Sequence, residues 1–484
     1  MQGRSYSGIV ELWEYASHDA VGLRGLITSG QVTAAEVEDA ARRALESADE
    51  RVNGLALPVF EPALDHADDG PLAGVPFLIK DSGPMAEGVP FFLGSRAISG
   101  VTARYDTDLM RRVRAAGLVT LGLTTVPELV ISFATEALRY GPTRNPWNLD
   151  RGVGGSSGGA AALVAAGAVP VAHANDGAGS GRVPASCCGL VGLKPSRGRT
   201  PCGPDLGEAG FGMACESGLT RTVRDAARYL DAIQGPVAGD KYTAPPPLRP
   251  YEDELAADPH RLRVAVTTRA WSGAPVDPEV AEAAVRTGRL LEEMGHAVTE
   301  ASPQIDWDAV LRAIATETVA LVAPVLLAPR RPDPARMEAV SRRILRMAEE
   351  FSALDLIAGM DAQNRLTRAV GAFFTEYDLL VTPTIARLPA PHGTLRYDDP
   401  GHTVESWLRA EFDYGPFTSL FNVSGQPAVS LPLAQSGDGL PIGVQLAAPY
   451  GREDLLFRVA ARLEEAVPWH DRVPPAGLRR AGGR

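Results

Sequence analysis

The fold of this chain is decided by residues 152–195, which read GVGGSSGGAAALVAAGAVPVAHANDGAGSGRVPASCCGLVGLKP. This stretch is rich in Gly, Ala and Ser and carries few charges. Residues 160–167 predict a helix and residues 169–174 a strand, and each is flanked by a Gly/Ser loop. Helices and strands that alternate in this way are typical of α/β proteins. We therefore expect an α/β fold with a largely parallel sheet.

The segments on either side continue the alternation. Residues 74–80 (GVPFLIK) predict a short buried strand that carries Lys80 into the interior. Residues 141–148 (GPTRNPWN) predict a loop, and the Pro-rich residues 244–250 a surface linker. The other predicted helices cover residues 33–45, 108–116, 278–293, 453–466 and, with a charged break at 330–336, residues 307–376. The other predicted strands cover residues 119–123, 261–267, 377–383, 429–433 and 443–446.

Composition limits the class of protein. Of the 484 residues, 45% are hydrophobic and 22% are charged, so the chain can bury a large core. The formal net charge of −12 argues against broad binding to a phosphate backbone. We expect no nucleic-acid partner.

Metal and membrane signals are also weak. The four cysteines, at positions 187, 188, 202 and 215, form no Cys-x-x-Cys pair, and no histidine lies between His173 and His260. This spacing predicts reduced cysteines and no metal site. Residues 1–17 are polar and acidic, unlike a secretory signal, and the longest uncharged apolar run, residues 160–172, is too short to span a bilayer. We expect a soluble cytoplasmic protein without a membrane partner.

Two Gly/Ser loops and one lysine are the candidates for chemistry. In residues 154–159 and 176–182, small residues would let backbone N–H groups gather around a ligand atom. Alone, a Gly/Ser loop is more often a turn or an anion cradle than the site of a nucleophile. Lys80 alone could be a surface lysine at the end of a strand. If it is buried, its pKa falls and it can serve as a base for a serine nucleophile.

Together these segments resemble the amidase signature family. The resemblance rests on the two loops, on residues 184–195 and on residues 74–81 (GVPFLIKD). Further motifs similar to the family's lie at residues 122–128, 141–147, 218–223, 421–422 and 439–445. The resemblance implies a large, mixed, mostly parallel sheet covered by helices on both faces, with no cofactor.

The resemblance also implies a Ser–cis-Ser–Lys triad that hydrolyses or transfers amide bonds. Lys80 matches the family's lysine, Ser156 its bridging serine with a cis peptide bond, and Ser180 its nucleophile, 24 residues further on. The backbone N–H groups of Gly177, Ala178, Gly179 and Ser180 are then expected to form the oxyanion hole. Four further residues are expected to support the site, namely Ser157, Asp176, Arg182 and Thr125.

The supporting roles leave alternatives open. Asp176 could orient the loop or belong to an ordinary turn, and Arg182 is expected to pair with a carboxylate rather than touch the substrate. Thr125 could bond near the lysine or be a satisfied core threonine. A Ser–His arrangement with His173 is disfavoured, because Lys80 already supplies a base.

The chain departs from the family pattern at two positions and shows a branch likeness. Ala178 stands where a glycine is usual, which leaves the backbone donors intact. Gly181 stands where an aliphatic residue is usual, which could loosen the turn. Residues 174–180 (ANDGAGS) are similar to the branch of 6-aminohexanoate cyclic-dimer hydrolases.

We expect one domain over residues 1–484. It would comprise an N-terminal helical part (1–70), a catalytic core (71–235), variable substrate-pocket helices (300–376) and a flexible tail (474–484). Residues 205–213 and 307–376 should close a mostly apolar pocket for an aryl or alkyl amide.

The leading function is a stand-alone hydrolase of a small-molecule amide, and we leave a homodimer open. The alternatives are a biosynthetic enzyme that passes the acyl group to an amine, the glutaminase subunit of a tRNA-dependent amidotransferase, and an inactive binding protein. The glutaminase subunit usually has Met-Asp-Glu-Phe where this chain has Val126-Pro127-Glu128-Leu129. An inactive protein is disfavoured because all three triad positions are filled.

Overall fold

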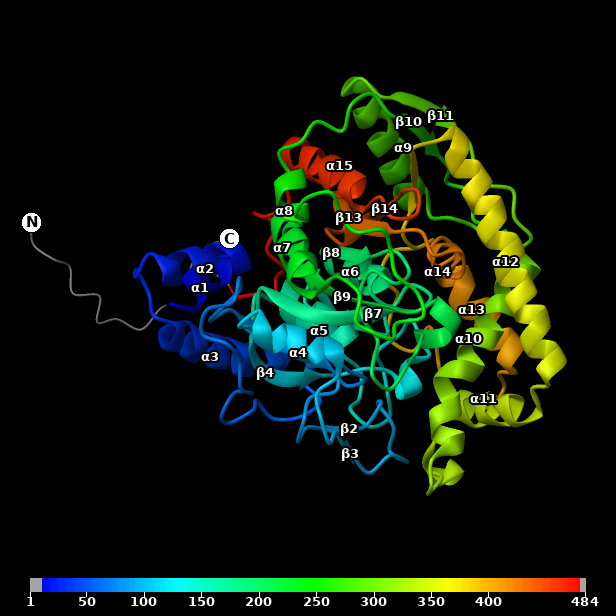
Figure 1. The fold of residues 1–484 in the computed structure, drawn as a ribbon, viewed down its shortest axis with the longest axis horizontal. Coiled ribbons are helices and arrows are strands. Elements are labelled where there is room, and N and C mark those ends of the chain that lie inside the picture. Colours follow the sequence, from blue (N-terminus) through cyan, green and yellow to red (C-terminus); the bar gives the residue numbers. More distant parts are fainter. Residues whose placement is uncertain (1–10, 479–484) are drawn as a thin grey trace, which may run out of the picture.

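The computed structural model describes residues 11–478 and has helices and strands alternating along most of the chain (Figure 1). The helices are α1 (Leu12–Ser17), α2 (Ala20–Thr28), α3 (Ala34–Val52), α4 (Asp108–Ala115), α5 (Gly158–Ala165), α6 (Arg182–Cys188), α7 (Val223–Ile233), α8 (Tyr251–Glu254), α9 (Pro278–Glu293), α10 (Trp307–Leu327), α11 (Ala339–Glu350), α12 (Ala353–Glu376), α13 (Val404–Tyr414), α14 (Ser419–Ser424) and α15 (Glu453–Ala466). The strands are β1 (Pro76–Lys80), β2 (Pro90–Phe91), β3 (Val101–Thr102), β4 (Val119–Thr124), β5 (Arg144–Asn145), β6 (Asn148–Gly152), β7 (Val171–Asp176), β8 (Val191–Lys194), β9 (Cys215–Thr220), β10 (Arg263–Val266), β11 (Ala297–Glu300), β12 (Leu379–Pro383), β13 (Ala428–Gln435) and β14 (Pro441–Ala447).

The central sheet has eight strands in the order β11-β10-β12-β14-β13-β8-β9-β7. It is mixed, as expected, but the expectation of a mostly parallel sheet is wrong. Only the pairs β11–β10 and β10–β12 are parallel, and the other five neighbouring pairs are antiparallel. One cause is the tight turn at residues 436–439, which joins β13 to β14 as a hairpin and so fixes them antiparallel.

Helices cover both faces of this sheet, as expected. Along β12, Leu379 and Val381 belong to one hydrophobic core and Leu380 to the other, because successive strand residues point to opposite faces. Helices α7, α9 and α15 contribute to the first core, and α5, α6 and α14 to the second. Each helix therefore buries an apolar face against the sheet.

The pair β1 and β4 is parallel and places Lys80 opposite Thr124. Strand β1 also contacts β7, the edge strand of the large sheet. All five residues of β1 are buried, as the apolar run GVPFLIK predicted. The C-terminal end of β1 is thereby brought to the C-terminal end of β7.

Several local features follow directly from the sequence. Helix α3 begins with a capping box, in which Thr33 Oγ1 accepts from the N–H of Glu36 at 3.1 Å and Glu36 Oε2 accepts from the N–H of Thr33 at 2.8 Å. The segment 141–148, predicted as a loop, instead contains the short strand β5, which pairs with β6. Two-residue strands of this kind leave no periodic pattern in a sequence.

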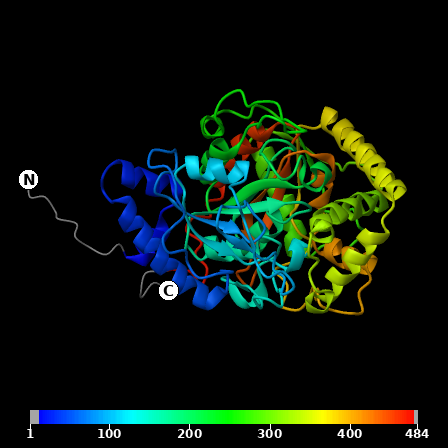
Figure 2. The same ribbon diagram turned by 60° about the horizontal axis from the view of Figure 1, so that its bottom comes forward.

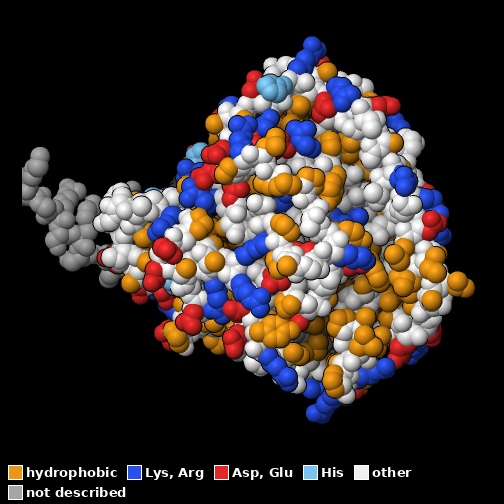
Figure 3. Space-filling view, in the orientation of Figure 1, with side chains coloured by type: hydrophobic (Ala, Val, Ile, Leu, Met, Phe, Trp, Pro, Cys, Tyr) orange, Lys and Arg blue, Asp and Glu red, His pale blue; other side chains and the backbone are white. Residues whose placement is uncertain are grey.

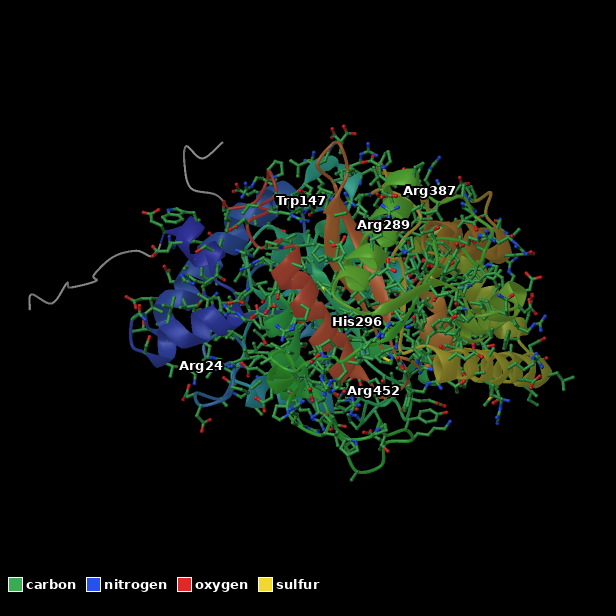
Figure 4. All side chains as sticks on the ribbon, turned by 90° about the horizontal axis from the view of Figure 1, so that it is seen from above. Arg24, Trp147, Arg289, His296, Arg387 and Arg452 are labelled. Carbon is green, nitrogen blue, oxygen red and sulfur yellow. The ribbon has the colours of Figure 1, made fainter. Side chains whose placement is uncertain are left out.

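The predicted helical region 307–376 consists of α10, α11 and α12, with the break near residues 328–338. These helices lie at the opposite end of the molecule from the N-terminal helices α1–α3, as both Figure 2 and Figure 4 show. Helix α10 is long and apolar enough, by length and composition alone, to cross a membrane. In this fold it packs against α11 and α12 and buries Val310, Ile314 and Val322.

The predicted flexible tail lies partly inside the described residues. Ala476 donates its N–H to Pro146 O at 3.0 Å and Leu478 donates to Ala166 O at 2.9 Å, so residues 474–478 are held against the domain. The remainder, residues 479–484, and the N-terminal residues 1–10 lie outside the described part of the chain.

Candidate active site

The centre of the site is Lys80 at the end of β1. Its side chain is fully buried. The Nζ atom donates hydrogen bonds to Ser156 Oγ at 2.7 Å and to Asn175 Oδ1 at 2.6 Å. These three side chains come from β1, from the loop before α5 and from β7, so the fold joins segments that are 76 and 95 residues from Lys80 in the sequence.

The surroundings of Lys80 favour its neutral form. Burial lowers the pKa of Lys80 to about 7, although the negative charges of Glu216 and Asp176 act in the opposite direction. A neutral amine is a proton acceptor, whereas an ammonium group is not. Near neutral pH a substantial fraction of this lysine can therefore act as a base.

Ser156 lies in the loop that precedes α5 and is almost completely buried. The peptide bond between Gly155 and Ser156 is cis. The loop lies very close to residues 132–134, because a β carbon at Gly155 would come within 2.4 Å of Ser132 O. The glycine is therefore needed to bring Ser156 to Lys80.

Ser180 lies in the loop between β7 and α6. It lines the same pocket as Ser156, Asn175, Gly177 and Ala178. The two Gly/Ser loops are linked at this point, because Ser157 donates its backbone N–H to Ser180 O at 3.2 Å and its Oγ to Asn175 O at 3.4 Å. The structure thus gathers Lys80, Ser156 and Ser180 into one site, while the chemical role of each stays a prediction.

The loop of residues 177–180 has free backbone donors. Within residues 11–478, no hydrogen-bond acceptor pairs with its four N–H groups. Gly179 has φ +143°, and a β carbon there would lie 2.4 Å from Thr418 Oγ1. That threonine donates to Ala178 O at 2.6 Å and holds the loop in place. Free donors on a fixed loop can stabilise a negatively charged oxygen.

A buried ion pair supports this loop from behind. Arg182 Nε and Nη2 donate to the two carboxylate oxygens of Asp176 at 2.9 and 2.8 Å, as expected for an arginine that pairs with a carboxylate. Asp176 Oδ2 also accepts the N–H groups of Gly181 and Arg182, both at 3.2 Å. Asp176 therefore does orient the loop through backbone hydrogen bonds.

The charge of this pair is stabilised by amides from the C-terminal part of the chain. Burial alone would raise the pKa of Asp176, but the charge and hydrogen bonds of Arg182, together with Asn422, hold that pKa well below its usual range. Arg182 also donates to Asn422 Oδ1 at 2.6 Å and to Gln445 Oε1 at 2.7 Å. The sequence motifs pointed to residues 421–422 and 439–445 without indicating this contact.

Two other candidates are placed differently. Thr125 Oγ1 donates to Gly54 O at 3.3 Å and is 2.7 Å from Thr143 Oγ1, so it is a satisfied core threonine rather than a partner of the lysine. His173 Nε2 lies 2.6 Å from Glu216 Oε2 on the neighbouring strand β9. Both residues hold the scaffold together. In contrast, the hydrogen bond that Lys80 donates to Asn175 was not predicted from the sequence, because no motif marks it.

The pocket over the site is only partly the one expected. Helix α10 contributes, as predicted, whereas none of residues 205–213 lines it; residues 130, 131 and 133 and helix α13 line it as well. Nine of its lining side chains are apolar: Val130, Ile131, Phe133, Ala178, Ala214, Ile314, Leu321, Leu408 and Phe412. Two buried carboxyl groups, those of Glu317 and Glu411, line it as well, and no pattern in the sequence marks them. The expectation of a mostly apolar pocket is therefore incomplete.

Residues 11–478 contain no group of three or more His, Cys, Asp or Glu side chains that could hold a metal ion. Cys187, Cys188, Cys202 and Cys215 are free thiols. The arrangement brings together a buried lysine, two serines and a loop with free backbone donors.

Known proteins resemble this chain in sequence and fold over nearly its whole length. A family model described as Amidase matches residues 36–457. A 6-aminohexanoate-cyclic-dimer hydrolase of Paenarthrobacter ureafaciens is 38% identical over 485 residues, which cover 96% of this chain and 97% of that protein. A solved structure of a 6-aminohexanoate cyclic dimer hydrolase has a TM-score of 0.87 at 37% identity and covers 95% of this chain and 99% of the other. The crystal structure of a bacterial aryl acylamidase of the amidase signature family has a TM-score of 0.81 at 26% identity and covers 95% of this chain and 98% of the other.

Proposed function

Because this chain belongs to the amidase family, whose members here are hydrolases of carbon–nitrogen bonds, we propose that it hydrolyses a small-molecule carboxamide through an acyl-enzyme on Ser180. One observation carries the proposal. The Nζ atom of a fully buried lysine, Lys80, donates a hydrogen bond to Ser156 Oγ at 2.7 Å, in the pocket that Ser180 also lines. A base, a relay and a nucleophile are what an acyl-transfer site requires.

In the first half of the reaction, neutral Lys80 takes a proton from Ser156, and Ser156 takes one from Ser180. The Oγ of Ser180 forms a bond to the amide carbon, and the carbonyl oxygen becomes an oxyanion. The N–H groups of residues 177–180 stabilise that charge, and one such donor is typically worth about 3–4 kcal/mol in the transition state.

The tetrahedral intermediate then breaks its C–N bond. The Lys80–Ser156 relay returns the proton to the departing nitrogen, so the amine leaves neutral and the acyl group stays on Ser180 as an ester. In the second half, water gives a proton to the relay and attacks the ester carbon. The carboxylic acid leaves and Ser180 regains its proton.

Two alternatives share this chemistry. An acyl-transferring enzyme would replace water by an amine in the second half. The glutaminase subunit of an amidotransferase would use glutamine as the amide, but residues 126–129 (VPEL) differ from the Met-Asp-Glu-Phe usual for that subunit. The relatives named as a cyclic-dimer hydrolase and an aryl acylamidase support hydrolysis of a small-molecule amide.

The test is a panel of amides followed by mass spectrometry of the quenched enzyme. The panel contains anilides, cyclic oligoamides and free glutamine, each with and without an added amine. We expect turnover of an anilide or a cyclic oligoamide to the free acid, and a transient acyl mass on the peptide that contains Ser180. Turnover of glutamine alone would overturn the stand-alone proposal, and an amide product in the presence of amine would favour acyl transfer.

A further inference from the structure

The carboxyl group of Glu317 is the most conspicuous unassigned group near the site. Glu317 lies on α10 and lines the same pocket as Ser156 and Ser180. Its side chain is only 2% exposed, and Oε1 has no hydrogen-bond partner among the residues that the structure describes. A buried polar oxygen without a partner costs free energy, so its presence calls for an explanation.

The backbone around Glu317 leaves room for its carboxyl group. A β carbon at Gly177 would lie 2.4 Å from Glu317 Oε1, and a β carbon at Gly210 would lie 2.8 Å from Glu317 Cγ. Glycine at these two positions thus lets the carboxyl group reach the loop of residues 177–180. On the proposed function, the group lies beside the place where the substrate carbonyl would bind.

The pocket has no internal positive charge to pair with Glu317. Among the described residues that line it, the ionisable ones are Glu317 and Glu411, and none is Lys, Arg or His. The charged groups that bear on Glu317 are Asp176 on β7, which is paired with Arg182, and Glu411 on α13. Burial raises the pKa of Glu317 well above its usual value, and these two acids raise it further.

More than half of the lining residues of this pocket are apolar, and the pocket lies near an apolar surface. Leu321, one turn along α10 from Glu317, lines the pocket and is 36% exposed. Other exposed apolar residues of this region are Leu327, Leu354, Ile357 and Met360. Figure 3 shows hydrophobic side chains gathered over the α10–α12 end of the molecule. The pocket therefore combines apolar walls with two carboxyl groups, of which Glu317 lies against the loop that carries the nucleophile.

We propose that Glu317 binds an N–H group in the acyl part of the substrate, so that the enzyme selects amides of amino acids or oligoamides over plain alkyl or aryl amides. The inference rests on the proposed function, because the acyl-enzyme on Ser180 defines where the acyl part lies. An ammonium group and a second amide both supply such an N–H donor.

The experiment measures binding without turnover, in a Ser180→Ala background. Calorimetry compares three primary amides with the same chain: 6-aminohexanamide, its N-acetyl derivative and heptanamide, in which a methyl group replaces the amine. Alaninamide and isobutyramide form a shorter pair. We expect the N–H-bearing member of at least one set to bind tenfold or more tightly than its methyl counterpart.

Variants of Glu317 identify the source of the N–H group. Glu317→Gln keeps an acceptor but no charge, and Glu317→Leu keeps neither. If the ligand is an ammonium, both variants should lose the preference; if it is an amide N–H, only Glu317→Leu should lose it. Glu411→Gln, which removes the other pocket acid, should keep it.

Any of three results would overturn the inference. The methyl and N–H members could bind equally in every set, the preference could survive in Glu317→Leu, or it could disappear in Glu411→Gln alone. Labelling of Ser180 by a fluorophosphonate in the single Glu317→Gln variant reports that the site is intact. If Ser180 is not labelled in the wild type but the preference is present, the proposed function fails, and the binding of an N–H group by Glu317 stands without its assignment to the acyl part. If labelling is normal and the preference is absent, only the inference about Glu317 fails.

Discussion

Asn175 Oδ1 accepts a hydrogen bond from Lys80 Nζ at 2.6 Å, slightly shorter than the bond from the same nitrogen to Ser156 Oγ. The side-chain amide of Asn175 carries no charge. It therefore fixes the position of the lysine without stabilising the ammonium form as a carboxylate would. Its position on β7, next to Asp176, ties the base to the loop that carries Ser180.

Replacing the side-chain amide of Asn175 by a carboxylate should raise the pKa of Lys80. In Asn175→Asp, a carboxylate beside Lys80 would raise the pKa of the lysine by roughly one to three. The pH at which kcat/KM rises should increase by a similar amount, so little activity should be left at pH 7. The pH profiles of the wild type and of Asn175→Asp measure this directly. An unchanged profile in a folded variant would show that Asn175 does not act on the base.

Lys80 should set the pH dependence of the wild type. Since burial lowers its pKa to about 7, kcat/KM should rise with pH through about 7 as the amine becomes neutral. Lys80→Met should remove this limb together with nearly all activity. Lys80→Arg should not rescue it, because a guanidinium keeps its proton at these pH values. A Lys80→Arg enzyme with a near-normal rate would exclude lysine as the base.

The same lysine should make the stability depend on pH. Its pKa is about 7 in the folded protein and near 10.4 in an unfolded chain, so the unfolded state binds more protons between those values. The free energy of unfolding should therefore rise with pH over this window. Lys80→Met should lack this contribution. Denaturant unfolding at pH 7 and pH 9 compares the wild type with Lys80→Met. If the free energy of unfolding rises equally in both proteins, groups other than Lys80 cause the rise.

The serines can be separated with a covalent probe. Ser180→Ala should lose turnover and labelling by a fluorophosphonate, because the nucleophilic oxygen is gone. Ser156→Ala should lower kcat by several orders of magnitude while binding is retained, because the proton relay is cut. The adjacent Ser157→Ala is the matched control, since it keeps the backbone N–H bond to Ser180 O. Labelling at another serine, with Ser180→Ala still active, would contradict the assignment.

Two glycines of the second loop should respond differently to the same change. Gly179→Ala places a β carbon 2.4 Å from Thr418 Oγ1 at φ +143°, so the loop must move and its free N–H groups with it. Activity should fall by about a hundredfold or more, the usual cost of losing one oxyanion donor. Gly181→Ala meets no atom closer than 3.5 Å and should be tolerated. Steady-state kinetics of both variants test this, and equal losses would argue against a specific role for the loop.

The Asp176–Arg182 pair should matter for stability. Asp176→Asn leaves Arg182 as an uncompensated buried charge, which typically costs about 3–5 kcal/mol of unfolding free energy. Glu405→Gln, which breaks an exposed pair with Arg409, is the control and should change little. Because the folded-state pKa of Asp176 is lowered, its stabilisation should hold above about pH 4 and be lost as the pH falls further. Urea titrations of the wild type and of Asp176→Asn at pH 7 measure the stabilisation by the pair. The same titrations at pH 3 measure how much of it is lost in acid.

Much of the local structure follows from the sequence alone. The predicted helices 278–293 and 453–466 match α9 and α15, because each has the helical spacing of apolar residues and clear ends. The buried strand that ends in Lys80 was equally readable, since an apolar run between Gly and Pro leaves few other structures open. The family resemblance then indicated which lysine and serines belong to one site.

The sequence determined the order of the elements, the buried strand that delivers Lys80 and the loops that carry Ser156 and Ser180, because these depend on neighbours a few residues apart. Only the tertiary structure decided that most pairings in the sheet are antiparallel, that Asn175 binds Lys80 and that Glu317 enters the pocket. Strand direction depends on how the connecting chain returns to the sheet. The contacts of Asn175 and Glu317 depend on packing between segments about a hundred or more residues apart in the chain. Neither leaves a periodic pattern in the sequence.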